Sequence, residues 1–493
     1  MMRDQYRGGS YRPLSDRDVE RIHEASEKIL ADVGFEISFP PIMDCLEQHG
    51  ARVDRQSKRV YLPRKLVTRF LKQAPEEFVY YGLEEGREIT VGRGRVHFGT
   101  GGKALYVQDV NNRRRPALLE DIVRFGRLAD QLDHVDFFII PVQPHDVNIH
   151  AQDITEFYAA LCATGKPVMG GVFSKKGLHD TIEMAALLAG GLKPLQDKPF
   201  VGFITSIASP LALEDDRAEL LWEIARHGLP LVVSTAPIAG ATAPVTLAGT
   251  LAQQNAEALM GIVLSQVVNP GAPVFYSAVP CTMDMRYGSF LMGSIESGLM
   301  NAAIAQMAHF YRVPCYITVG VTDSKTPDAQ AAYESATTSM LAALAGGDFI
   351  HQAFGFLDGS LTISYGQFMI DHDIVGSCLR TLKGIEVSPE TLALDVIARV
   401  GPRGNFLAEQ HTIEHMRDER YVPRVSHCLD YQNWLDTGGT SSGERAESIA
   451  AQMTDEPAAP YVSDAMKEKI FARFPVLRDA ECHETNGKGE QHD

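Results

Sequence analysis

Eight apolar runs, each followed by a helical pattern, dominate the middle of the chain. The runs lie at residues 96–107, 135–141, 167–173, 200–206, 230–235, 273–279, 314–320 and 348–354. The helical patterns lie near 118–132, 151–164, 178–190, 213–227, 246–268, 289–311, 327–345 and 366–380. Near-continuous apolar strands that alternate with helices indicate a parallel sheet covered on both faces. Eight such units predict an α/β fold, a (β/α)8 TIM barrel, over residues 95–385. The alternative is an open doubly wound sheet, but the nucleotide-type glycine loop of that fold is missing.

The segments on either side of the predicted barrel do not show this regular alternation of apolar runs and helical patterns. Residues 1–94 form a predicted α+β lead-in that packs on the barrel. It contains a loose arm over 1–13, helices that begin at Ser15, after Pro41 and at Arg64, and a hairpin over 51–62. Residues 386–493 form a predicted helical extension with a polar tail. Its helices lie at 407–420 and 463–474, a linker covers 436–447, and the tail over 483–493 is expected to be disordered.

Composition excludes several functional classes. The chain has 493 residues and a formal net charge of −17 without a block of Lys and Arg, which argues against nucleic acid and anionic membranes as partners. Seven scattered cysteines form no Cys-x-x-Cys pair, so a disulfide framework or a zinc knuckle is not expected. The polar start is not a signal peptide, and no apolar run reaches transmembrane length. We therefore expect a cytoplasmic protein.

The stretch PCYITVGVTDSKTPDAQAAY, residues 314–333, reads as a strand, a polar loop and a helix. The loop brings Asp323 and Lys325 to the carboxyl end of the seventh strand, with Glu334 in the helix that follows. In α/β barrels this end of the strands carries the chemistry. Thr326 is the expected helix cap. The alternative interpretation is a polar connection that only caps its helix.

Two short motifs point to other sites, but weakly. Gly99-Thr100-Gly101-Gly102-Lys103 lacks the spacing and the final Ser or Thr of a phosphate loop, so we interpret it as a glycine-rich turn that allows close approach to the backbone. His411-Thr412-Ile413-Glu414-His415 matches the inverted zinc pattern H-x-x-E-H. It lies outside the eight units, and a docking helix is the simpler interpretation. We predict no metal site.

The eighth run ends in a group of aromatic and polar residues. His351 and Gln352 end the strand, and Phe354, Phe356 and Tyr365 follow. Tyr276, on the sixth strand, is predicted to open into the same barrel mouth. Aromatic faces attract cations, most strongly when the cation is desolvated. The alternative for a strand histidine is a satisfied core residue.

Three segments resemble the trimethylamine methyltransferase family. They are VGVTDSKTPDAQAAYES, GDFIHQAFGFLDG and GPRGNFLAEQHTIEHMRDERYVPR. The resemblance covers nearly the whole chain, to about Trp434. It implies a TIM barrel and transfer of a methyl group from a methylated amine to the cobalt of a corrinoid on a separate protein. Some members of the family carry pyrrolysine and act on trimethylamine. Others lack it, and some of those use glycine betaine or related quaternary amines.

The sequence departs from the pyrrolysine type, because no such residue is present near Lys325-Thr326. A quaternary ammonium leaves as a neutral amine and a reduced Co(I) corrinoid is itself the nucleophile, so the protein need only position and desolvate the donor. The family's corrinoid carriers use an Asp-x-His-x-x-Gly motif, whereas Asp371-His372-Asp373-Ile374-Val375-Gly376 has the wrong spacing. We therefore expect a cognate corrinoid protein as partner and no tightly bound cofactor on this chain. Separately, we expect a homo-oligomer.

The resulting hypothesis is a methyltransferase for glycine betaine or a related betaine. The predicted aromatic cage consists of Phe354, Phe356, Tyr365 and Tyr276, the predicted negative groups are Asp323 and Glu334, and the predicted carboxylate donors are His351, Gln352 and Lys325. Two alternatives stay open. One is a metal-dependent barrel enzyme that uses His411, Glu414 and His415. The other is a protein that binds quaternary amines without chemistry.

Overall fold

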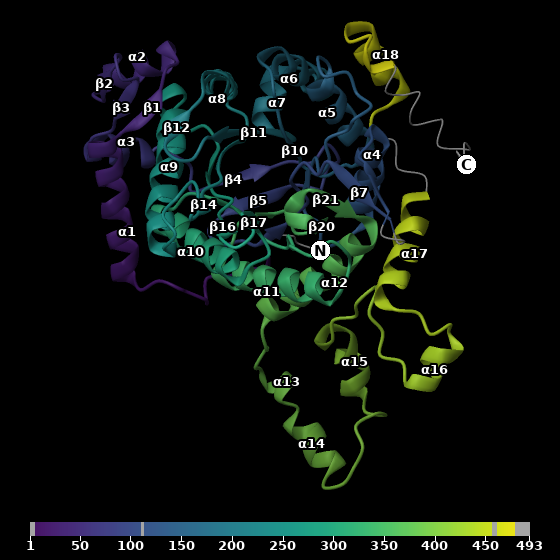
Figure 1. Cartoon of the computed structure of the whole chain (residues 1–493). Coiled ribbons are helices and arrows are strands. Elements are labelled where there is room, and N and C mark those ends of the chain that lie inside the picture. Colours follow the sequence, from purple (N-terminus) through teal and green to yellow (C-terminus); the bar gives the residue numbers. More distant parts are fainter. Residues whose placement is uncertain (1–4, 110–112, 456–460, 479–493) are drawn as a thin grey trace.

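A closed barrel of eight parallel strands forms the centre of the molecule (Figure 1). The computed structural model describes residues 5–109, 113–455 and 461–478. In chain order the barrel strands are β6 His97–Phe98, β9 Phe138–Ile139, β10 Val168–Gly171, β11 Val201–Ile207, β13 Leu231–Thr235, β15 Val274–Ser277, β18 Cys315–Thr318 and β19 Phe349–His351. From β9 to β19 each strand pairs in parallel with the next, and β19 pairs with β6. A parallel bridge between Gly99 and Phe137 closes the ring, which confirms the predicted TIM barrel.

Helices surround this barrel, as the helical patterns predict. They are α4 Leu119–Gln131, α5 Gln152–Ala163, α6 Lys175–Ala189 with the short α7 Leu192–Asp197, α8 Asp215–His227, α9 Leu247–Val268, α10 Ile295–Tyr311, α11 Ala329–Ala345 and α12 Tyr365–Lys383. The cap of α11 differs from the prediction. Asp328, not Thr326, accepts a hydrogen bond from the Ala331 N–H. Asp328 is the residue with an extended backbone directly before the first helical residue, Ala329. No helix in the described ranges has both the length and the apolarity needed to span a bilayer.

The amino end of the barrel is filled with side chains. The hairpin of β4 Glu77–Tyr80 and β5 Ile89–Gly92 contributes three apolar residues to a cluster in the barrel interior. The cluster consists of Tyr80, Ile89, Val91, Phe137, Ile139, Met169, Val232, Phe275, Tyr316 and Phe349. Phe137 and Phe349 stack at its centre, with their ring centroids 3.5 Å apart. The interior is therefore a packed core at this end and not a pore.

Two small sheets rim the opposite, carboxyl end. One contains β7 Tyr106–Gln108, β8 Arg114–Pro116, β20 Phe356–Leu357 and β21 Thr362–Ser364, with the 3-10 turn η3 Asp358–Ser360 between the last two. The other contains β14 Ile238–Ala239, β16 Cys281–Asp284 and β17 Ser289–Leu291. The predicted first strand over 96–107 is therefore two strands, because the chain leaves the barrel at the glycines that follow β6.

The amino-terminal segment packs on the barrel. Its elements are α1 Asp16–Lys28, η2 Ile29–Val33, β1 Phe35–Ile37, α2 Pro40–Gln48, β2 Arg52–Asp54, β3 Arg59–Tyr61 and α3 Arg64–Leu71. Ser15 caps α1 and the hairpin of β2 and β3 forms, both as predicted. Strand β1 also pairs with β12 Ala212–Leu213, which lies in the loop after β11. The prediction of a loose arm is wrong for the described residues, because the Gly9 N–H donates to the Leu344 carbonyl at 2.8 Å.

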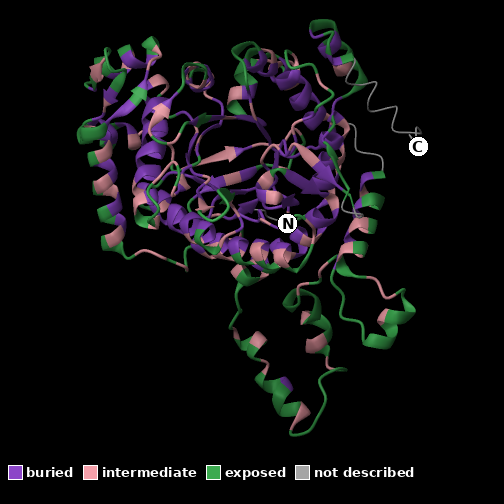
Figure 2. Ribbon diagram, viewed as in Figure 1, coloured by how far each residue is buried: buried purple, intermediate pink, exposed green. Residues whose placement is uncertain are grey.

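The carboxyl-terminal segment leaves the barrel after α12 and then returns to it. Its helices are α13 Pro389–Leu392, α14 Leu394–Val400, α15 Gln410–Glu419, α16 Tyr431–Asp436, α17 Ser442–Asp455 and α18 Asp464–Arg473. Helices α13 to α15 project away from the barrel and are mostly exposed (Figures 1 and 2). The linker predicted over 436–447 is wrong from Ser442, where α17 begins and packs on α12. The predicted tail over 483–493 lies outside the described residues.

Candidate active site

A buried histidine forms the floor of the carboxyl end. His351 lies on the same face of β19 as the core residue Phe349, two positions earlier. Its ring stacks on Tyr316, with 4.0 Å between the centroids. The side chain is 3% exposed, and neither ring nitrogen has a hydrogen-bond partner among the described residues. Unpaired buried polar atoms require an explanation, and a ligand or a water molecule that completes the site is one.

Burial also sets the charge of this histidine. It lowers the pKa of His351 to about 3, so the imidazole is neutral near pH 7. A neutral imidazole offers one N–H donor and one acceptor nitrogen. It can therefore hydrogen-bond to a ligand without repelling a cation.

Gly101 and Gly102 allow the first loop to pass directly over this floor. A Cβ atom at Gly101 would lie 2.7 Å from His351 Nδ1, and one at Gly102 would lie 2.6 Å from Gln352 Nε2. Gly102 also has a φ of +81°. His351 and Gln352 therefore pack directly against the backbone of this turn, and the expected approach of a substrate or a partner stays a prediction.

Gln352 connects three loops at the carboxyl end. Its backbone φ of 60° breaks the alternation of the strand. Its Oε1 accepts from Thr318 Oγ1 at 2.6 Å, and its Nε2 donates to Ser360 Oγ at 3.0 Å. The amide is engaged at both ends, so Gln352 holds the loops in position.

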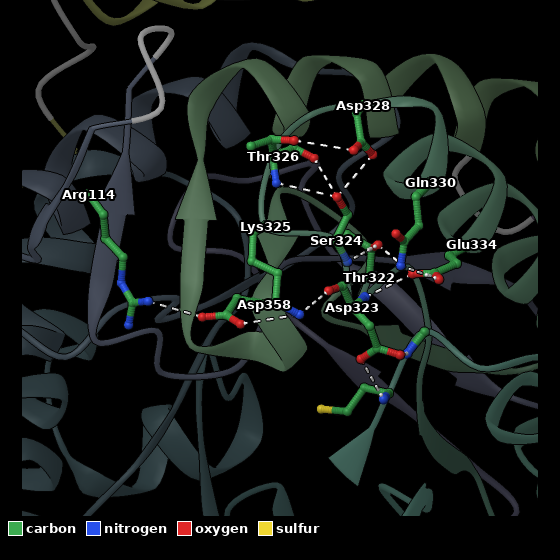
Figure 3. Close-up of polar contacts among 12 residues, drawn as sticks. Arg114, Thr322, Asp323, Ser324, Lys325, Thr326, Asp328, Gln330, Glu334 and Asp358 are labelled. Carbon is green, nitrogen blue, oxygen red and sulfur yellow. Dashed lines mark hydrogen bonds and ion pairs between the residues drawn. The ribbon is translucent and has the colours of Figure 1, made fainter. Parts of the chain in front are cut away.

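The loop after β18 is held by its own two acids (Figure 3). Asp323 accepts from the backbone N–H groups of Met292 and Gly293 at 3.0 and 3.1 Å. Glu334 Oε2 accepts from Thr322 Oγ1 at 2.5 Å and from the Asp323 N–H at 2.8 Å. Burial, and then the neighbouring Glu334, raise the pKa of Asp323. The two predicted acids thus fix the loop, and they bring negative charge to the rim.

Lys325 lies on the outside of the same loop. Its side chain is 71% exposed. Its Nζ donates to the Asp323 carbonyl at 2.5 Å and lies 3.7 Å from Asp358 Oδ1, which is close to Arg114 (Figure 3). The ammonium group is therefore directed to the rim and not to the barrel interior.

Tyr276 and Phe354 lie in the layer between strands and helices, so their predicted place in the mouth is wrong. The Tyr276 hydroxyl donates to Asn255 Oδ1, on α9, at 2.6 Å. Phe354 stacks on Phe368 of α12, with 5.2 Å between the centroids. Both side chains are fully buried. They leave β15 and the loop after β19 on the side opposite to the interior residues.

Tyr365 also lies outside the barrel, and only Phe356 of the predicted cage stays near the floor. The Tyr365 ring stacks on Phe125 at 4.1 Å, and its hydroxyl donates to Asp121 Oδ1 at 2.8 Å. Phe356 is buried beside Gly102, where a Cβ atom would lie 2.8 Å from its ring.

The strands opposite His351 end in small side chains that stay accessible. Ile204 packs on the interior cluster and Val232 belongs to it, so Ser206 and Ser234, two positions later on these strands, face the same way. Ser206 is nevertheless exposed and Ser234 is half-buried, and Ala208 and Ala236, just past the strand ends, are exposed as well. The carboxyl end of the barrel is thus open above a buried floor.

A buried ion pair at this end was missed from the sequence. Lys103 Nζ lies 2.6 Å from Oε2 of Glu156, which is on α5 and fully buried. The same Nζ lies 4.3 Å from the ring centroid of Phe173, which is 43% exposed at the end of β10. The lysine of the glycine-rich turn was the available signal. No signal in the sequence identified Glu156, 53 residues away, as its partner.

The H-x-x-E-H segment lies on the projecting helix α15. The rings of His411 and His415 lie 4.3 Å apart, and His415 Nε2 lies 3.5 Å from Glu390. Within the described residues no three His, Cys, Asp or Glu side chains form a group that could hold a metal ion.

Comparison with known proteins agrees with this architecture. The model of the trimethylamine methyltransferase (MTTB) family matches residues 4–481. A glycine betaine methyltransferase from Desulfitobacterium hafniense (strain Y51) is 35% identical over 468 residues, 95% of this chain and 96% of the relative. The trimethylamine methyltransferase MttB from D. hafniense (strain DSM 10664 / DCB-2) is 33% identical and covers 93% of this chain and 92% of its own length.

A solved structure shares the fold. The crystal structure of the hydroxylamine complex of MtmB aligns with a TM-score of 0.50 at 12% sequence identity, and the alignment covers 92% of this chain and 96% of that one. The family model matches almost the whole chain, and both relatives are more than 30% identical to it. The chain is a methyltransferase that belongs to the trimethylamine methyltransferase family.

Proposed function

We propose that this methyltransferase transfers a methyl group from a quaternary amine to the Co(I) corrinoid of a separate corrinoid protein. Glycine betaine is the first candidate donor, and other betaines such as proline betaine and carnitine follow. The observation that carries the proposal is the floor of the open carboxyl end, a neutral and buried His351 with both ring nitrogens unpaired. The 35% identity to a glycine betaine methyltransferase supports the choice of donor.

The chemistry of a quaternary donor suits such a site. A quaternary nitrogen has no N–H, so hydrogen bonds cannot hold it, and it leaves as a neutral tertiary amine. The protein then supplies no acid and no nucleophile. It has to strip water from the cation and align the methyl group with its acceptor. A neutral imidazole floor permits both, whereas an imidazolium would repel the cation.

Aromatic faces and acids at the rim supply the attraction for the cation. The proposed aromatic set is Phe356 near the floor with Phe290 of β17, which is 41% exposed. Asp323 and Glu334 add negative potential at the same end. This set replaces the cage members that lie outside the barrel.

The corrinoid is assigned to a partner because the nearest motif on this chain does not fit it. Asp371, His372 and Asp373 lie in the middle of α12 and are buried. His372 stacks on His134 with 4.5 Å between the centroids, and Asp371 accepts from the Gly355 N–H at 2.7 Å. These side chains hold the fold and cannot reach a cobalt ion. The open carboxyl end of the barrel is where a carrier would deliver the methyl acceptor.

The test is a donor screen with free Co(I) cobalamin as acceptor. Purified protein is incubated with glycine betaine, proline betaine, carnitine, tetramethylammonium and trimethylamine, and the methyl-Co(III) product is followed by its absorbance. We expect a betaine to react fastest and trimethylamine to react much more slowly. Equal rates for trimethylamine and glycine betaine would refute the argument from the leaving group. Binding without methyl transfer would favour a binding protein, and activity that is lost on chelation and restored by zinc would favour a metalloenzyme.

A further inference from the structure

The ion pair between Lys103 and Glu156 has a position that core packing does not explain. Glu156 is fully buried and lies on α5, and Lys103 reaches it from the loop above the floor of the barrel. Gln152 donates to the second carboxylate oxygen of Glu156 at 2.7 Å. Buried ion pairs rarely stabilise a fold more than apolar residues of the same volume would. A buried pair at the open end of a barrel is therefore a candidate for a functional role.

We propose that Lys103, held in place by Glu156, is the cation that binds the carboxylate of the methyl donor. The assignment rests on the proposed function and makes it more specific. It predicts that the enzyme selects zwitterionic donors over quaternary cations without a carboxylate.

The ammonium group of Lys103 has hydrogen-bonding capacity to spare. Lysine carries three N–H donors. The short contact to Glu156 uses one, and the contact to the Gly171 carbonyl, at 3.4 Å, is long. The side chain is 17% exposed, whereas that of Glu156 is fully buried.

The location of Lys103 suits a small zwitterion. Gly101, two residues earlier, lies directly against His351. Two residues span at most about 7 Å of chain, so the lysine backbone stays close to the floor. Lys103 and His351 thus lie at the same end of the barrel, on segments that touch.

The carboxylate donors predicted from the sequence are less well placed. The Lys325 ammonium is directed to the outer rim, and the Gln352 amide is engaged at both ends. His351 offers one N–H, but it is neutral. An ammonium forms the stronger, charge-assisted bond to a carboxylate. Lys103 is therefore the better-placed cation for this role.

The experiment compares two donors that share a quaternary nitrogen and differ in the carboxylate. Binding of glycine betaine and of tetramethylammonium is measured by calorimetry, and methyl transfer from each to Co(I) cobalamin is measured in parallel. The variants are Lys103→Met, the double variant Lys103→Met/Glu156→Gln and the control Lys175→Met. The double variant avoids an unpaired buried carboxylate. Lys175 is a nearby surface lysine, 45% exposed and paired with Glu219.

The expected result is a selective loss. Lys103→Met and the double variant should weaken glycine betaine binding about 10- to 100-fold, the range for a hydrogen bond to a charged group. Tetramethylammonium binding should be unchanged or tighter in Lys103→Met, which removes a positive charge. It should be unchanged in the double variant, which removes one charge of each sign. Lys175→Met should change neither.

Equal losses for both donors, or unchanged betaine binding in the double variant, would overturn the assignment. A wild-type protein that binds neither donor would overturn it as well. If the wild type binds glycine betaine through Lys103 but transfers no methyl group, the proposed function fails and the anion site stands.

Discussion

The two ends of the barrel differ in packing: the amino end is filled with buried rings, and the carboxyl end has unpaired and exposed polar groups. At the amino end the hairpin of β4 and β5 places Tyr80 over a stack of rings that includes Phe137 and Phe349, and these side chains are fully buried. At the carboxyl end His351 has unpaired nitrogens, and Ser206 is exposed. The difference indicates that one end of the ring provides stability and the other provides recognition. The recognition end retains polar atoms that cost folding free energy unless a ligand pairs with them.

The largest effect should come from the amino end. Phe137→Ala removes a buried ring that stacks on Phe349, and it should lower the free energy of unfolding by about 3–5 kcal/mol. The shift of the urea midpoint, followed by circular dichroism, measures this loss. Methyl transfer per folded molecule should be unchanged. Reduced activity of the fully folded variant would contradict the assignment of stability to one end of the barrel and recognition to the other.

At the carboxyl end the corresponding change should affect activity and not stability. His351→Phe keeps the stacking on Tyr316 but removes both nitrogens, and it should lower kcat/KM for the best donor about 100-fold. The melting temperature should stay the same or rise, because two unpaired buried atoms are gone.

His372→Phe is the matched control for this variant. His372 is also a buried histidine whose ring nitrogens make no hydrogen bond to the described residues, although its Nδ1 lies 4.0 Å from Asp373 Oδ1. It lies on α12, outside the barrel. Its substitution should leave kcat/KM unchanged. Equal activity losses in the two variants would show that any buried histidine matters, and would remove His351 from the site.

A smaller effect, on stability and not on turnover, is expected for a residue in the helices around the barrel. Tyr365→Phe removes the hydroxyl that donates to Asp121, and should cost about 1–2 kcal/mol of stability. Turnover should be unchanged, because the ring stacks on Phe125 behind the strands. Thermal unfolding and the cobalamin assay measure the two quantities. A tenfold fall in turnover would place Tyr365 back in the site.

A further effect is a pH dependence of stability from Asp371. Burial raises its pKa in the folded protein to about 7, above the usual value near 4 in an unfolded chain. The folded state then binds more protons between pH 4 and 7, so stability should fall as the pH rises through this window and should level off above it. Asp371→Asn should remove this pH dependence of the melting temperature, measured between pH 5 and 8. The pH dependence corresponds to less than about one proton difference between the folded and unfolded states. An identical slope in the variant would contradict the assignment.

Local signals in the sequence predicted most of the fold. The eight strand–helix units follow from the period of the apolar residues, and the cap at Ser15 follows from its hydroxyl before a helical pattern. His351 and Phe356 were predicted because strand ends in a barrel carry the chemistry, and the structure places both near the floor of the carboxyl end. The amino-terminal arm was misjudged because its glycines bond to backbone atoms far along the chain, such as the Leu344 carbonyl, and composition does not report such bonds.

The sequence alone thus determined the barrel and the strand end at which the candidate site lies, and tertiary structure decided which side chains face it. Parallel strands in a barrel are buried on both faces, so their inward and outward residues are equally apolar. Tyr276, on β15, could not be told from inward-facing residues for this reason. Phe354 lies past the end of β19, where strand alternation no longer applies. The pair of Lys103 and Glu156 joins a loop to a helix 53 residues away, and only closure of the barrel brings the two charges together.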